Sequence, residues 1–171
     1  MNKRITPLLL LIGLVWGQSK IDINDLIDRE RLLYAPNKDK PYTGSVFDFY
    51  ENGQKKINGR YRNGIKHGKW SWWDENGRMD STGSYKKGLK SGQWKNYYKS
   101  GKKEIVGTFK DGKANGKFSM WYENGQKISE GNLKNGLRTG KWTDWYDNGQ
   151  KQQEGTFKDG EKDGLWTEWY K

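Results

Sequence analysis

The fold of this chain is decided by the stretch Gly116-Lys117-Phe118-Ser119-Met120-Trp121-Tyr122-Glu123-Asn124-Gly125. An Asn-Gly pair that follows a run of aromatic, β-prone residues is a strong hairpin signal, because both residues accept a positive φ. Close copies of the stretch begin 24 residues before it, at Gly92, and 24 residues after it, at Gly140. The stretch is therefore one strand and one turn of a repeated unit.

Glycines carry this period through residues 44–171. The first glycine of each unit, here position 0, falls at Gly44, Gly68, Gly92, Gly116, Gly140 and Gly164. A second turn ends each full unit, at Asn63-Gly64, Lys87-Gly88, Asp111-Gly112, Asn135-Gly136 and Asp159-Gly160. No proline interrupts the repeats, as continuous β-ladders require. Strand, turn, strand, turn in 24 residues predicts an antiparallel meander with six first strands and five second strands.

The turns also predict the register. If Asn52-Gly53 is a two-residue turn, position 2 pairs with the glycine at position 15. We expect each large ring to cover the glycine opposite it, which pins the register. The expected pairs are Trp70 over Gly83, Trp94 over Gly107, and Trp142 over Gly155. Aromatic residues also recur at position 5, which has the opposite parity. Either a bulge intervenes or both faces of the sheet carry aromatic rings.

The composition is that of a thin structure rather than a disordered chain. Only 32% of the 171 residues are hydrophobic, but 10 Trp, 10 Tyr and 5 Phe are present, and disordered segments are poor in aromatics. The absence of cysteine excludes disulfides and cysteine-based zinc sites, and the single histidine excludes a His-pair metal site. We expect no cofactor. The net charge of +11 suits an acidic partner, an anionic surface or a nucleic acid.

Three segments are expected. Residues 1–17 have the pattern of an export signal, with Lys3 and Arg4 before an apolar run that is too short to span a bilayer. A retained membrane anchor is the alternative. Residues 18–43 are off phase and are expected to form an N-terminal cap, with a short helix after Asn24 as N-cap and a strand at residues 32–34. Residues 44–171 are the repeat array. A cleaved signal places the protein in the periplasm or outside the cell.

The unit resembles the MORN repeat (membrane occupation and recognition nexus), and its bacterial variant in the YwqK-type antitoxin family. The motif Gly-x-Trp-x-x-Trp-Tyr-x-Asn-Gly and the junction His67-Gly68-Lys69-Trp70 carry the resemblance, which covers about residues 42–171. It implies an all-β, elongated, single-layer solenoid of hairpins that is curved and has an aromatic-lined groove. For function it implies binding to membranes, to copies of itself or to other proteins, and the antitoxin label implies neutralising a toxin by binding it.

Catalysis is not expected, so we predict that the protein is not an enzyme. The carboxylates beside the first turns recur in nearly every unit, whereas a catalytic site occurs once. These residues are Glu51, Glu75, Glu123 and Asp147. Their recurrence beside turns is typical of solvated turn residues.

Two sets of binding residues are candidates. The aromatic set, expected to contact a partner protein, is Trp72, Trp73, Tyr97, Trp121, Trp145 and Trp169. The basic set, expected to contact an anionic membrane or cell-wall polymer, is Arg62, Lys86, Lys110, Lys134 and Lys158, with Lys66, Lys90, Arg138 and Lys162 nearby. The first hypothesis is a non-catalytic protein-interaction module. The alternatives are toxin immunity and attachment to an anionic surface. Export and the scarcity of arginine disfavour nucleic acid. Self-association through the last strand is a further expectation.

Overall fold

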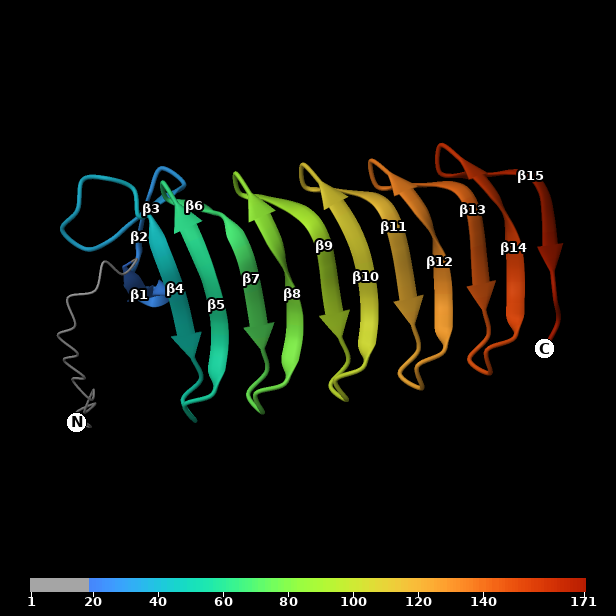
Figure 1. Cartoon of the computed structure of the whole chain (residues 1–171), viewed down its shortest axis with the longest axis horizontal. Coiled ribbons are helices and arrows are strands. Elements are labelled where there is room, and N and C mark those ends of the chain that lie inside the picture. Colours follow the sequence, from blue (N-terminus) through green and yellow to red (C-terminus); the bar gives the residue numbers. More distant parts are fainter. Residues whose placement is uncertain (1–18) are drawn as a thin grey trace.

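Residues 19–171 are described by the computed structural model, and the expected export signal at residues 1–17 lies outside them. The described residues form one elongated sheet of 13 strands, with a small two-stranded sheet at its first end (Figure 1). Strands of the array pair with their neighbours in the chain, so the expected antiparallel meander is confirmed. Within residues 19–171, no helix has the length and apolar character needed to cross a membrane.

The array contains the six first strands and five second strands that the glycine period predicts. The first strands are β4 (Gly44–Phe49), β7 (Gly68–Trp73), β9 (Leu89–Tyr97), β11 (Lys113–Trp121), β13 (Leu137–Trp145) and β15 (Glu161–Glu168). The second strands are β5 (Lys55–Arg62), β8 (Met79–Lys86), β10 (Lys103–Lys110), β12 (Lys127–Lys134) and β14 (Lys151–Lys158). A short strand, β6 (Ile65–Lys66), pairs with β5 just before β7.

The turns at the two edges of the sheet differ in type. At the edge drawn uppermost in Figure 1, both turn residues have positive φ, for example 50° at Asn63 and 73° at Gly64, as a two-residue turn requires. At the lower edge only the glycine has positive φ, for example 83° at Gly53. There the Gly53 N–H donates to the Tyr50 carbonyl at 2.9 Å, which closes a three-residue loop. The expected two-residue turn at Asn52-Gly53 is therefore wrong.

The predicted register is nevertheless confirmed. Position 2 pairs with position 15 in all five hairpins, for example Trp70 with Gly83 and Trp94 with Gly107. The three-residue loop shifts the pairing by one residue, and a bulge in the second strand shifts it back. In the second hairpin, Trp73 pairs with Met79 and Trp72 pairs with Ser81, so Asp80 is the extra residue. The three-residue loop and the bulge thus compensate for each other and give the register that a two-residue turn would give.

Both faces of the sheet carry aromatic rings, because the bulge lies in the second strand and β7 itself alternates regularly. Trp70 and Trp72 therefore share one face, and their rings stack with centroids 5.6 Å apart. Ser71 and Trp73 lie on the other face. We call the first of these the tryptophan face. Its position-2 rings form the core, and Trp70 and Trp142 are only 1% and 2% exposed.

Each position-2 ring of the tryptophan face covers a glycine, but not the glycine opposite it. Trp94 pairs with Gly107, yet its ring lies against Gly83 of the preceding strand, where a Cβ would overlap the ring atoms. The Trp94 Nε1–H donates to the Ser84 carbonyl at 3.1 Å. The expectation that Trp94 covers Gly107 is wrong, and Phe118 covers that glycine. The cause is a register shift between Thr82 and Ser84, which leaves Gly83 out of the ladder on that side and makes room for the ring.

Residues 19–43 pack against the first strand of the array. Strand β1 (Lys20–Asp22) runs parallel to β4, and the hairpin of β2 (Ile27–Arg29) and β3 (Leu32–Tyr34) follows. The strand expected at residues 32–34 is confirmed. The expected helix is only a three-residue 3-10 turn, η1 (Ile23–Asp25), and its N-cap is Asp22 rather than Asn24. The Asp22 side chain accepts the Asn24 N–H at 2.9 Å, so the N-cap lies two residues earlier than expected.

Tyrosines at position 6 tie neighbouring repeats together along the lower edge. The Tyr98 hydroxyl donates to the Trp121 carbonyl at 2.6 Å, and Tyr50, Tyr122 and Tyr146 make the equivalent bond. Asp74 is the exception to this ladder. It pairs with Arg78 at 2.8 Å and closes its own turn instead.

Candidate functional site: the cationic turn edge

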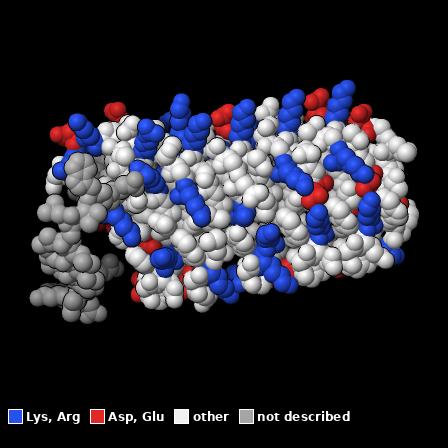
Figure 2. Space-filling model, in the orientation of Figure 1, with Lys and Arg blue, Asp and Glu red and all other residues white. Residues whose placement is uncertain are grey.

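The upper edge of the sheet gathers cations from five hairpin turns. We call this surface, made of residues 62–65, 86–89, 110–113, 134–137 and 158–161, the turn edge. Each two-residue turn follows the end of a second strand, so the position-18 side chain stands directly beside the turn. These residues are the predicted Arg62, Lys86, Lys110, Lys134 and Lys158. Figure 2 shows Lys and Arg side chains projecting along this edge.

These five cations are exposed, and none of them forms an ion pair with another residue of the described chain. The first two turns contain no acidic residue, whereas Asp111 lies in the third turn and Asp159 and Glu161 lie in the fifth. Successive position-18 residues are two strands, or about 10 Å, apart. The turn edge is therefore a row of exposed positive charge, in which acidic residues accompany the cations only at the third and fifth turns.

Apolar side chains lie between these cations, and the sequence analysis missed them. Ile65, Leu89 and Leu137 are 38%, 49% and 52% exposed at position 21. Leu89 extends over the next turn, where its Cδ2 would lie 3.3 Å from a Cβ at Gly112. Their common position in the repeat could have revealed them, but Lys113 and Glu161 occupy that position in the other two units. The edge therefore presents cations and aliphatic groups together.

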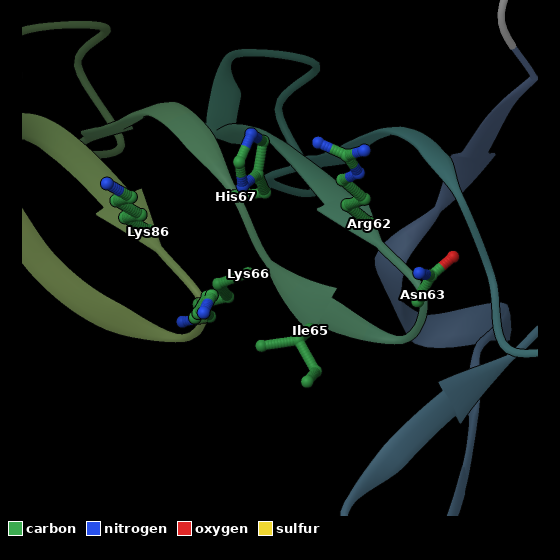
Figure 3. A pocket seen from close by; sticks show the side chains of 7 residues that line it. Arg62, Asn63, Ile65, Lys66, His67 and Lys86 are labelled. Carbon is green, nitrogen blue, oxygen red and sulfur yellow. The ribbon is translucent and has the colours of Figure 1, made fainter.

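Two cavities open between neighbouring turns of this edge. The first has a volume of about 500 Å³ and is lined by Arg62, Asn63, Ile65, Lys66, His67, Lys86 and Lys87 (Figure 3). The second lies 48 residues, or two repeats, further along and has a volume of about 430 Å³. Its lining residues are Lys110, Asp111, Lys113, Asn115, Lys134 and Asn135. The unique histidine thus belongs to the first cavity only.

The second basic set has a structural role. Lys66, Lys90, Arg138 and Lys162 lie on the tryptophan face, with their charged groups 4.1–4.6 Å from the centroid of the nearest tryptophan ring. Contacts of this kind are cation–π interactions. A cation stands there wherever position 2 of the next unit is Trp, whereas Ala114 precedes Phe118. Burial lowers the pKa of the Lys66 ammonium group. This set, expected near the position-18 cations, therefore also stacks on the tryptophan rings.

The aromatic candidates lie far from the turn edge and do not form one surface. Trp73, Tyr97, Trp121 and Trp145 end their strands at the lower edge, on the face opposite the tryptophan face, and Trp169 directly follows the last strand. Lysines partly cover this row: the Nζ of Lys127 lies 5.5 Å from the Trp145 ring centroid, and that of Lys151 lies 5.3 Å from the Trp169 centroid. Trp72 lies on the tryptophan face, where its ring contacts those of Trp70 and Trp94.

Among the described residues, no three His, Cys, Asp or Glu side chains lie close enough together to hold a metal ion. The recurring carboxylates are turn residues, as the sequence suggests. Asp147, for example, pairs with Lys171 at 2.6 Å. The geometry of the turn edge is that of a binding surface.

Comparison with known families agrees with this architecture. The family model described as "MORN repeat variant" matches residues 66–87, 90–111, 114–135 and 138–159, just over half of the chain. The chain belongs to the MORN repeat family. MORN repeats are in general non-catalytic modules that bind proteins or membranes. The antitoxin role stays a prediction.

Known structures add little beyond the family. A crystal structure of a GtfA/B complex bound to UDP and GlcNAc matches 77% of this MORN repeat chain at 11% identity, with a TM-score of 0.25. The match spans 23% of that longer chain. A search of curated proteins found no match.

Proposed function

We propose that this MORN repeat protein is an exported, non-catalytic module that attaches to an anionic membrane surface through its turn edge. The observation that carries the proposal is the row of five exposed cations, none of them paired within the described chain, with aliphatic side chains between them. A row about 40 Å long matches a flat, extended partner better than a compact one.

Electrostatics supply the long-range part of the attachment. A Lys or Arg near an anionic leaflet contributes about 1 kcal/mol, so five cations in contact contribute about 5 kcal/mol. Acidic residues weaken the third and fifth turns, because Asp111, Asp159 and Glu161 repel the same surface. The first, second and fourth turns, which contain no acidic residue, therefore face the membrane most closely.

Aliphatic side chains supply the short-range part. Ile65, Leu89 and Leu137 are about half exposed and stand at the same edge as the cations. Apolar groups beside cations are what interfacial segments insert at the boundary between headgroups and acyl chains. An acidic protein partner would use the cations but would not require this pattern, so a membrane surface fits both features.

The aromatic faces support the alternative of a protein partner less well. Position-2 rings are buried under the basic side chains that stack on them, for example Trp142 under Arg138 at 4.2 Å. Of the lower-edge rings, those of Trp145 and Trp169 are partly covered by lysines. Neither set is an open aromatic groove of the kind the resemblance implied.

Binding to lipid vesicles tests the proposal. We expect the protein to sediment with vesicles that contain phosphatidylglycerol but not with purely zwitterionic vesicles, and expect binding to fall steeply between 50 and 500 mM salt as charges are screened. The double variant Leu89→Ser, Leu137→Ser is expected to bind about thirtyfold more weakly, because half-buried leucines contribute about 1 kcal/mol each.

The matched control is Leu165→Ser, which removes a leucine that is 89% exposed outside the turn edge. Its vesicle binding should equal that of the unmodified protein. Equal binding to zwitterionic and anionic vesicles, or an equal loss in the control and the double variant, would show that the turn edge is not the attachment surface.

A further inference from the structure

The first cavity of the turn edge brings several basic residues together without an acidic one. Arg62 and Lys86, from successive position-18 sites, line it together with Lys66, Lys87 and His67, and no carboxylate lines it. Figure 3 shows these side chains coming from the β5–β6 turn and from the next turn along the sheet. Four basic residues thus line one hollow of about 500 Å³, and the Lys66 ammonium group among them lies over the Trp70 ring. This volume falls within the usual range for ligand sites.

Lys66 lacks a counter-charge in spite of its partial burial. Its Nζ lies 4.6 Å from the Trp70 ring centroid and 5.3 Å from that of Tyr85, and no described carboxylate pairs with it. Two of its three counterparts further along the sheet have acidic neighbours, whereas Lys90, which is also half-buried, has no ion pair within the described chain. Arg138 lies 4.0 Å from Asp144, and Lys162 lies 3.8 Å from Glu168. A half-buried cation without a counterion is stabilised by an anion placed beside it.

The in-phase cavity two repeats away shows what is specific to the first. Lys110 and Lys134 occupy the places of Arg62 and Lys86, so the position-18 cations are present at both cavities. Asp111 replaces Asn63, however, and brings a carboxylate into the lining. Asn115 replaces His67, and Ala114 removes the half-buried cation. The first cavity is therefore the one built without negative charge.

We propose that the first cavity binds a phosphate monoester group. Such a group carries nearly two negative charges, which matches several cations around one hollow better than a single carboxylate does. The Arg62 guanidinium offers a planar fork of donors that fits phosphate oxygens, and Asn63 and His67 add further hydrogen-bond donors. This inference goes beyond membrane attachment, because a soluble phosphate compound would fill the cavity without any surface being bound.

Nuclear magnetic resonance of His67 reports on the cavity alone, because the chain contains a single histidine. Titration with inorganic phosphate, at constant ionic strength set by sodium chloride, is expected to shift the imidazole signal along a saturating curve. Arg62→Gln and Lys86→Gln should each weaken this binding about tenfold, since each removes a charge-assisted hydrogen bond. The in-phase controls Lys110→Gln and Lys134→Gln should leave it within twofold. All four side chains are exposed, and unchanged melting temperatures confirm folding.

Vesicles distinguish a lipid headgroup from a soluble phosphate. Phosphatidic acid, a phosphate monoester, is compared with phosphatidylglycerol, a diester, at equal vesicle charge. A saturating shift with inorganic phosphate supports a soluble ligand, and a shift only with phosphatidic acid vesicles supports a lipid one. No saturating shift with either probe overturns the proposal, and so does an equal loss in the cavity and control variants. Failure of vesicle attachment through the other turns would leave the phosphate titration unaffected.

Discussion

Reversing three lysines of the turn edge is expected to weaken binding to anionic vesicles by at least about a hundredfold. The variant carries Lys86→Glu, Lys110→Glu and Lys134→Glu. Loss of about 1 kcal/mol for each removed cation already gives about 3 kcal/mol, and the new carboxylates add repulsion. All three side chains are exposed and unpaired within the described chain, so the fold should persist. The measurement is the vesicle dissociation constant at 100 mM salt.

A matched variant changes the net charge equally at the other edge. Lys55, Lys99 and Lys102 are exposed lysines at the lower turns, and their replacement by glutamate changes the charge by the same amount. Its affinity should fall only severalfold, because the total charge acts through screened distances. Equal losses in the two variants would mean that net charge, rather than the turn edge, holds the protein to the surface.

Replacing Gly83 by alanine is expected to lower the free energy of unfolding by about 3 kcal/mol. The added Cβ overlaps the buried ring of Trp94, which also donates its Nε1–H to the Ser84 carbonyl at 3.1 Å. The ring cannot move without leaving its hydrogen bond and its contact with Tyr85, whose centroid is 5.0 Å away. Forced overpacking of this kind costs about 1–3 kcal/mol, and the lost bond adds to it. Urea unfolding measures the change.

Gly107→Ala supplies the comparison within the same sheet. Its Cβ would lie 2.9 Å from the edge of Phe118, a smaller ring with no indole N–H to hold it in place. We expect Gly107→Ala to lower the free energy of unfolding by less than about half as much as Gly83→Ala does. A loss at Gly107 that equals or exceeds the loss at Gly83 would show that the rings do not cover the glycines as described.

The glycine period was sufficient to predict strand order and register but not turn type. Asn-Gly suits both a two-residue turn and a three-residue loop, because only the glycine needs positive φ in the second. The residue that decides between them is the extra one in the second strand, such as Asp80, and nothing about its chemistry marks it as a bulge. The glycine that each ring covers could not be predicted for a related reason. The pairing register identifies the residue opposite Trp94, but it does not show over which neighbouring strand the Trp94 ring packs.

The turn-edge cations were predictable because they directly precede the second turn in every unit. The role of Lys66 and its in-phase partners was predictable in principle, since strand alternation places them on the face of the following tryptophan. Their positive charge alone, however, suggests the same role as the position-18 cations. Cavities between turns depend on side-chain packing across repeats, so the distinct chemistry beside His67 emerges only from the folded chain.

Labelling the two edges of the sheet tests membrane attachment most directly. The chain contains no cysteine, so Lys113→Cys at the turn edge and Lys99→Cys at a lower turn each give one site for an environment-sensitive fluorophore. With phosphatidylglycerol vesicles, the label at residue 113 should shift to the blue and be quenched by lipid-phase quenchers, whereas the label at residue 99 should do neither. Equal responses at both residues, or a response at residue 99 alone, would contradict attachment through the turn edge.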